Sequence, residues 1–149
     1  MIGSPPILIV EDNADDWFLL ERSFGIANVP NVLRRVADGQ QAIDYLQGSA
    51  SYRDRAANPL PSLVLLDLKL PFKNGFEVLA WLRQQHQLIG IVVVILTSSS
   101  EDKDVSKAYE LGANAYLVKP TSVNRLTETV QALNIFWFDH NKFKALPSA

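Results

Sequence analysis

The sequence predicts a single α/β domain built on a doubly wound, five-stranded parallel sheet. Four short apolar segments have the pattern of buried strands, a fifth is more polar, and a segment with helical spacing follows each one. Nearly continuous aliphatic runs are typical of parallel strands that are covered on both faces. Alternation of strand and helix implies right-handed crossovers, with helices on both sides of the sheet. The 149 residues (1–149) suit one domain, with a core over about 6–137.

The expected strands are identified by their composition. Four of them consist almost entirely of aliphatic residues, whereas the second in the chain is more polar and is expected nearer an edge of the sheet. In chain order the segments are Ile7–Val10, Val32–Val36, Leu63–Leu66, Ile91–Leu96 and Ala115–Val118.

Residues that cap helices mark where the expected helices begin and end. Asn13, followed by Asp16 three residues later, can start the first helix, and Asp38 and Asn74 precede the second and third. The fourth follows a serine run and is expected to stop at Gly112. The fifth has an apolar stripe made of Val123, Leu126, Val130, Leu133 and Trp137.

Two segments fall outside this alternation. Gly48–Pro61 is long for a connection between a helix and a strand, and its Ser, Asn, Arg and Pro content predicts an exposed loop. The tail, over about 139–149, is polar and is expected to be frayed.

Composition narrows the classes of function. The formal net charge is −2 and no run of Lys or Arg exceeds two residues, which argues against direct binding to nucleic acid. The absence of cysteine excludes disulfides and thiolate metal sites. The start, MIGSPPILIVED, lacks the features of a signal peptide, and no apolar run reaches transmembrane length. We therefore expect a soluble, cytoplasmic protein with no membrane partner.

Polar side chains follow four of the expected strands where each strand ends. Glu11 and Asp12 follow the first, Asp67 the third, Thr97 the fourth and Lys119 the fifth. Ligands of open α/β sheets bind outside the carboxyl ends of the strands, so these groups are expected to converge. Taken singly, each could be a helix cap, a turn residue or a surface lysine. Their joint placement favours a functional site.

The residue types in this group suit phosphoryl transfer to an aspartate. Clustered carboxylates persist mainly where a cation compensates their charge, and oxygen ligands without His or Cys suit Mg²⁺. A lysine can neutralise an anionic ligand, and a threonine hydroxyl can hydrogen-bond a phosphoryl oxygen. A carboxylate nucleophile with these partners is what such a transfer requires.

The segments IVEDN, LLDLKLPFKNG, ILTSS and LVKP closely resemble the signature of response-regulator receiver domains. The resemblance covers residues 6 to about 137 and implies a flavodoxin-like sheet with strand order 2-1-3-4-5. It implies a stand-alone regulator that accepts a phosphoryl group from a histidine kinase onto an aspartate. Such a protein signals by conformational change and protein contacts, and is not an enzyme.

The same resemblance implies a role for each site residue. Asp67 would be the phosphoacceptor. Glu11 and Asp12 would form the acidic pair, with Asp12 the more direct Mg²⁺ ligand, and the backbone carbonyl of Lys69 would complete the protein ligands.

The resemblance also implies the groups that sense the phosphoryl group. Thr97 and Lys119 would bind its oxygens, Tyr116 matches the switch aromatic, and Pro120 matches the position after a cis peptide bond. Lys69 and Ser99 occupy the positions that tune phosphoryl lifetime in the family.

A narrower resemblance concerns the partner. The long Gly48–Pro61 loop, KNG, YELGANAYLVKP and the aromatic IFWF look like the small regulators paired with cyanobacterial phytochrome histidine kinases. This resemblance implies a phytochrome as the kinase.

The end of the last helix predicts self-association. Ile135, Phe136 and Phe138 add apolar groups outside the stripe that docks the helix, so part of this surface is expected to be exposed. We expect a homodimer made by the fourth helix, the fifth strand and the fifth helix. The alternative, that Phe136 or Phe138 folds back under the tail, stays open.

Three other functions agree less well with this sequence. An aspartate-based phosphatase of the haloacid dehalogenase kind needs a second Asp two residues after its nucleophile, where this chain has Lys69. A flavodoxin-like nucleotide-binding module needs a glycine loop after the first strand, but EDNADD is acidic and would repel phosphate. A phosphorylation-silent scaffold is disfavoured because the set of site residues is intact.

Overall fold

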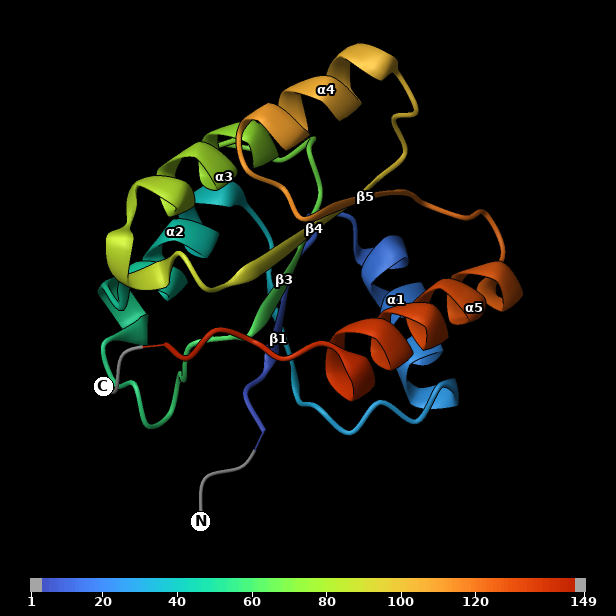
Figure 1. Cartoon of the computed structure of the whole chain (residues 1–149), viewed down its shortest axis with the longest axis horizontal. Helices are drawn as coiled ribbons and strands as arrows, with labels where there is room; N and C mark the ends of the chain where they lie inside the picture. The colour runs from blue at the N-terminus through green and yellow to red at the C-terminus, as the bar shows by residue number, and fades with distance from the viewer. Residues whose placement is uncertain (1–3, 147–149) are drawn as a thin grey trace.

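The computed structural model describes residues 4–146 and confirms the predicted sheet (Figure 1). Five parallel strands lie in the order β2-β1-β3-β4-β5. The strands are β1 (Ile7–Val10), β2 (Leu33–Val36), β3 (Leu63–Leu66), β4 (Val92–Thr97) and β5 (Ala115–Val118). The α-helices are α1 (Ala14–Ile26), α2 (Gly39–Gln47), α3 (Gly75–Gln84), α4 (Asp102–Glu110) and α5 (Val123–Leu133). Three other helical segments are η1 (Ala50–Tyr52), η2 (His86–Leu88) and η3 (Asn134–His140).

The helices form a layer on each face of the sheet (Figure 1). α1 and α5 cover one face, and α2, α3 and α4 cover the other. Neighbouring residues of a strand point to opposite faces, so Ile7 and Ile9 of β1 pack with α1 and α5, whereas Leu8 and Val10 pack with α2 and α3. β2 lies at an edge, as its polar sequence predicts. β5 forms the other edge and is only partly buried, although its sequence resembles that of a buried strand.

Local capping places the connections that follow β1 and β3. The side chains of Asn13 and Asn74 each accept an N–H from the residue three positions later, as does Asp38 before α2. At Asn74 the cap is reciprocal, since Glu77 accepts the Asn74 N–H. Both connections therefore lead into helices whose starting residues are held by side-chain hydrogen bonds.

The last helix does not continue regularly to Trp137. α5 ends at Leu133, and η3 is a π-helical segment in which the Phe136 carbonyl accepts the N–H of Asn141, at 2.7 Å. The expected frayed tail is wrong for residues 141–146, which run along the amino edge of the sheet (Figure 1). Phe143 packs against Phe138, and Leu146 joins the core on the α2–α3 side. Residues 147–149 lie outside the described part.

The Gly48–Pro61 segment is exposed in part but has a defined conformation. The Arg55 guanidinium donates to the carbonyls of Tyr45 and Leu46, both at 2.6 Å, and so satisfies two carbonyls at the end of α2. The Tyr45 hydroxyl donates to the Pro59 carbonyl at 2.8 Å. These bonds hold the long connection against α2. Over residues 4–146, no helix combines the length and the apolar character needed to cross a bilayer.

Candidate functional site

Three carboxylates from two strand ends gather at the carboxyl edge of the sheet. Glu11 and Asp12 follow β1, Asp67 follows β3, and one oxygen from each lies within 4.8 Å of the others. Glu11 and Asp67 are buried, whereas Asp12 is exposed. The structure thus brings together the acidic residues that the sequence predicts to converge, although 55 residues separate Asp12 from Asp67.

The Lys119 ammonium group lies among these carboxylates. Its Nζ is 2.5 Å from Glu11 Oε1, 2.9 Å from Asp67 Oδ2 and 3.0 Å from Asp16 Oδ2. The three protons of the ammonium group therefore have three carboxylate partners. Within residues 4–146, Lys119 is the one cation that pairs with these carboxylates, so the cluster that they form with Asp12 carries a net negative charge.

Asp16 is a member of this site that the sequence reasoning missed. From the sequence, Asp16 is expected only to accompany the Asn13 cap, and its N–H does donate to the Asn13 side chain. Its side chain, however, accepts from Lys119. The spacing in the sequence could have indicated it: Asp16 is four residues after Asp12, about one helical turn, so its side chain can lie near the same edge of the sheet.

Burial and pairing act in opposite directions on the ionisation of the site. Burial lowers the pKa of Lys119, but hydrogen bonds to Asp67 and Glu11, with attraction to Asp67, outweigh it and hold the pKa above its usual value. Burial raises the pKa of Glu11, and the hydrogen bond from Lys119 opposes this rise. Lys119 is therefore a permanent cation at neutral pH.

The backbone around Asp67 holds its carboxylate in place. Asp67 Oδ1 accepts the N–H of Leu68 at 2.7 Å and that of Lys69 at 3.4 Å. Gly75, the first residue of α3, allows the helix to pack directly on this segment, because a Cβ there would lie 2.2 Å from the Asp67 carbonyl oxygen. Oδ2 faces Lys119.

Thr97 supplies a buried hydroxyl at the end of β4. The residue has no exposed surface, and its hydroxyl has no hydrogen-bond partner among residues 4–146. A buried hydroxyl left unpaired costs about 1–3 kcal/mol, so this group is suited to a ligand oxygen from outside the chain. Lys119 lies beside it on the neighbouring strand end, since its N–H donates to the Thr97 carbonyl at 2.7 Å.

Tyr116 is attached to the segment between β4 and α4. Its hydroxyl donates to the carbonyl of Ser99 at 2.9 Å, and the Ser99 hydroxyl donates to Asp104 at 2.6 Å. No peptide bond within 4–146 is cis, so the cis bond expected before Pro120 is not found.

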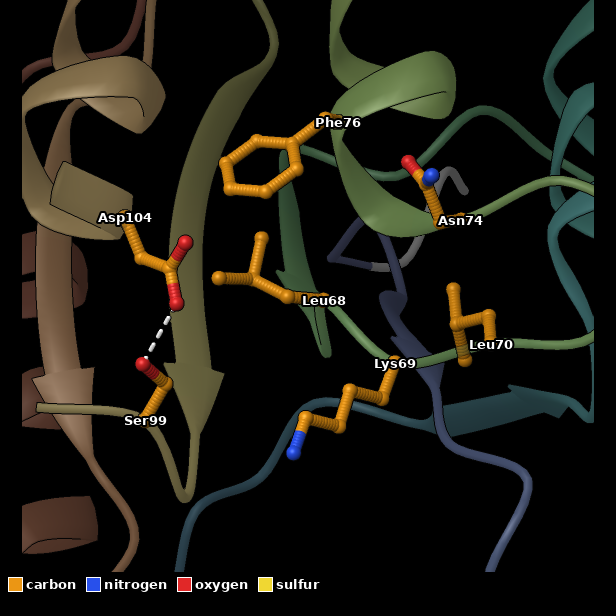
Figure 2. A pocket seen from close by; sticks show the side chains of 7 residues that line it. All are labelled: Leu68, Lys69, Leu70, Asn74, Phe76, Ser99 and Asp104. Atoms are coloured by element: carbon orange, nitrogen blue, oxygen red, sulfur yellow. Dashed lines mark hydrogen bonds between the residues drawn. The ribbon is translucent and has the colours of Figure 1, made fainter. Parts of the chain in front are cut away.

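A hollow of about 360 Å³ lies beside this segment, between the β3–α3 and β4–α4 connections (Figure 2). Ser99 and Asp104 form one side of it, and the Lys69 side chain extends from the other. The remaining lining residues are Leu68, Leu70, Asn74 and Phe76. The two positions expected to tune phosphoryl lifetime, Lys69 and Ser99, therefore line the same space.

Comparison with known proteins identifies a family whose members this chain resembles in sequence and structure. A family model described as response regulator receiver domain matches residues 7–131. The chain is 38% identical over 139 residues to response regulator Rcp1 of Synechocystis, covering 92% of each chain. The crystal structure of the Mn²⁺-bound form of Rcp1 is 37% identical, with a TM-score of 0.85 and coverage of 95% of this chain and 99% of that one.

Two further proteins are similar over most of their length. The probable methanogenesis regulatory protein FilR2 of Methanothrix harundinacea is 37% identical, with 91% of this chain and 85% of FilR2 covered. The phosphorylated cyanobacterial phytochrome response regulator RcpA is 32% identical in its crystal structure, with a TM-score of 0.88 and coverage of 96% and 100%.

Proposed function

The chain belongs to the response regulator receiver domain family, and we propose that Asp67 is the aspartate on which it receives its phosphoryl group. A response regulator accepts that group from a histidine kinase and signals through its shape and its contacts with other proteins. The observation that supports Asp67 is its position. Its Oδ2 pairs with Lys119, and the unpaired hydroxyl of Thr97 lies at the neighbouring strand end. We take residues 1–149 as one receiver unit, since the match to Rcp1 covers 92% of each chain.

The transfer is an exchange of one bond to phosphorus for another. An Asp67 carboxylate oxygen forms the new P–O bond while the P–N bond of the phosphohistidine breaks, and the departing ring nitrogen keeps that electron pair. Lys119 already lies at Asp67 Oδ2 and can donate to a phosphoryl oxygen, and Thr97 can donate to another. These two donors supply charge and hydrogen bonds where negative charge develops.

The carboxylates of Glu11, Asp12 and Asp67 suit a hard divalent cation. Their oxygens lie within 4.8 Å of one another, and the set contains no nitrogen or sulfur ligand. We assign the cation as Mg²⁺, held by these three residues and by the backbone carbonyl of Lys69. When bound, Mg²⁺ would neutralise phosphoryl charge at Asp67. The Mn²⁺-bound form of Rcp1 supports a divalent cation.

Labelling with a small phosphodonor tests this function. Acetyl phosphate with Mg²⁺ should give a phosphorylated chain, and removal of Mg²⁺ by EDTA should slow labelling by more than about tenfold, because the acidic edge then repels the donor. Intact-mass spectrometry measures the fraction phosphorylated over time. Equal rates with and without Mg²⁺ would contradict the metal assignment, and no labelling at all would contradict the function.

We propose that a phytochrome is the kinase partner, because RcpA is a phytochrome response regulator and the sequence resembles that group. A purified, autophosphorylated cyanobacterial phytochrome kinase should transfer its phosphoryl group to this chain faster than a histidine kinase that is not a photoreceptor. The name of FilR2 points to a different pathway, and the comparison of rates decides between the two.

Phosphorylation is proposed to act through the hydrogen bond between Tyr116 and Ser99. A phosphoryl group on Asp67 should attract the Thr97 hydroxyl and move the adjoining segment, which carries the carbonyl that Tyr116 contacts. Beryllofluoride, a phosphoryl mimic, should therefore change the ¹⁹F resonance of fluorotyrosine at position 116. The same resonance in the Thr97→Ala variant should respond much less. An unchanged wild-type spectrum would rule out this coupling.

A homodimer through α4, β5 and α5 is also proposed. Ile135 and Phe136 are exposed, as are Tyr109 of α4 and Val118 of β5. The expectation was wrong for Phe138, which is half-buried and packs against Phe143 of the tail. These exposed apolar side chains include two aromatic residues, a composition typical of protein interfaces.

Phe136→Asp should convert the dimer into a folded monomer, because it places a charge in the proposed apolar interface. Sedimentation velocity at concentrations on the order of tens of micromolar measures the change. Val32→Asp is the matched control, since Val32 is equally exposed but precedes β2 at the far edge of the sheet. A wild type that stays monomeric, with or without phosphorylation, would remove the proposal.

A further inference from the structure

Phe72 is the most exposed large apolar side chain within residues 4–146, with 84% of its surface accessible. It lies five residues beyond Asp67, in the connection between β3 and α3. Exposure of a whole phenyl ring gives no stability to the isolated domain, since the ring buries almost no area. An exposed ring so close to the phosphoacceptor is suited to contact with a partner protein.

The backbone at Phe72 has a conformation that favours glycine. Its φ is +66°, and the N–H of Lys73 donates to the carbonyl of Pro71 at 2.8 Å, so Phe72 is the central residue of a γ-turn with positive φ. This type of γ-turn is rare and strained for residues with a side chain. The chain thus carries a strained residue whose ring makes almost no contact with the rest of the domain.

The turn is held in this position by α2. Gly39, the first residue of α2, allows the turn to approach so closely that a Cβ there would lie 1.8 Å from the Lys73 carbonyl oxygen. The Gly39 N–H also points to the Pro71 carbonyl, at 3.4 Å. Because the turn rests on a helix, the Phe72 ring projects from a fixed point of the carboxyl edge. Strain that persists because the surroundings impose it is common at ligand contacts.

A histidine kinase that phosphorylates Asp67 must bind over the carboxyl edge of the sheet. Only 7% of the surface of Asp67 is exposed, and the residue lies among the connections that follow β1, β3, β4 and β5. A phosphohistidine can therefore reach it only from the carboxyl side of the sheet. Transfer requires the reacting atoms to approach within about 3–3.5 Å. A folded kinase that brings its histidine this close must also contact the segments that project around Asp67, and Phe72 is on one of them.

From these observations we propose that Phe72 is a docking residue for the histidine kinase, and that its ring enters an apolar hollow beside the phosphohistidine. Lys69 and Lys73, three residues before Phe72 and one after it, are also exposed on this connection, which favours a kinase surface with carboxylates around its apolar hollow. Burial of an aromatic anchor on docking is a common source of binding energy at interfaces. The inference rests on the proposed function, because it takes Asp67 as the acceptor.

The test compares two phosphodonors on four variants. The protein donor is whichever of a panel of purified, autophosphorylated histidine kinases, both phytochromes and kinases that are not photoreceptors, labels the wild type fastest, and the small donor is acetyl phosphate with Mg²⁺. Phe72→Ala and Phe72→Gly should each slow transfer from the kinase by about tenfold, and neither should change labelling by acetyl phosphate. Phe72→Tyr keeps the ring and should retain transfer from the kinase. Ile89→Ala removes an exposed apolar side chain at the opposite edge and is the matched control.

The pair Phe72→Ala and Phe72→Gly separates the ring from the strain. Glycine adopts a positive φ without strain, so the urea midpoint of the Phe72→Gly variant should be at or above that of the Phe72→Ala variant. If transfer from the kinase is slowed equally in the two variants, the loss of the ring is the cause. Slowing in only one of them, or unchanged transfer in both, would overturn the docking role.

Two other outcomes are decisive. Equal slowing with both donors would also overturn the docking role, because it would show damage at Asp67. If no kinase of the panel labels the wild type, both the phytochrome partner and the docking residue are rejected. Labelling by acetyl phosphate still tests separately whether Asp67 is the phosphoacceptor.

Discussion

Asp67→Asn should abolish phosphorylation by acetyl phosphate and by a kinase while leaving the domain folded. The substitution keeps the volume of the side chain but removes the nucleophilic carboxylate. An amide oxygen can still accept the N–H of Leu68, and Lys119 keeps Glu11 and Asp16 as partners. We therefore expect the free energy of unfolding to change by no more than about 1–2 kcal/mol.

Intact-mass spectrometry after incubation with acetyl phosphate and Mg²⁺ measures this effect, and urea unfolding measures the stability. Asp102→Asn is a suitable control, because Asp102 is an exposed carboxylate outside the site. It should be labelled like the wild type. If Asp67→Asn is labelled fully as well, another residue is the phosphoacceptor.

Asp12→Ala should weaken Mg²⁺ binding by well over tenfold. Asp12 is the exposed member of the carboxylate group, so its oxygens face water from which a hydrated cation arrives. Loss of a charged ligand from such a site costs roughly a few kcal/mol, and about 1.4 kcal/mol corresponds to tenfold in affinity. The fold should tolerate the change, since the side chain is exposed and has no packing role.

Trp17 fluorescence offers a direct measure of binding. Arg35 donates to the carbonyls of Glu11 and Asp12, and its guanidinium carbon lies 5.9 Å from the centre of the Trp17 ring. A cation at Asp12 should alter this contact and the emission of the indole. Trp17→Phe identifies the part of the signal that comes from this residue, since the chain has three tryptophans.

Asp15→Ala is the matched control for charge. Asp15 is also exposed and lies in the first turn of α1, but it does not belong to the carboxylate group. It should weaken Mg²⁺ binding only slightly, through loss of a screened charge. Equal losses in the two variants would mean that Asp12 acts through its charge and is not a ligand.

The amino-acid sequence by itself determined most of the fold. Four aliphatic runs and one more polar segment predicted the five strands to within about one residue, and Asn13, Asp38 and Asn74 marked three helix starts. These features depend on residues within a few positions of one another. The acidic residues at the ends of β1 and β3 were also predictable, because a parallel sheet brings its carboxyl ends to one edge.

Only the tertiary structure decided how side chains from distant segments meet. Asp16 joins Lys119 across 103 residues of sequence, Phe138 is covered by Phe143 of a tail that reads as polar, and β5 is left half-exposed at the edge of the sheet. The turn that carries Phe72 likewise rests on Gly39 at the start of α2. None of these contacts leaves a local pattern, because each depends on how two helical layers pack on the sheet and where the chain crosses between them.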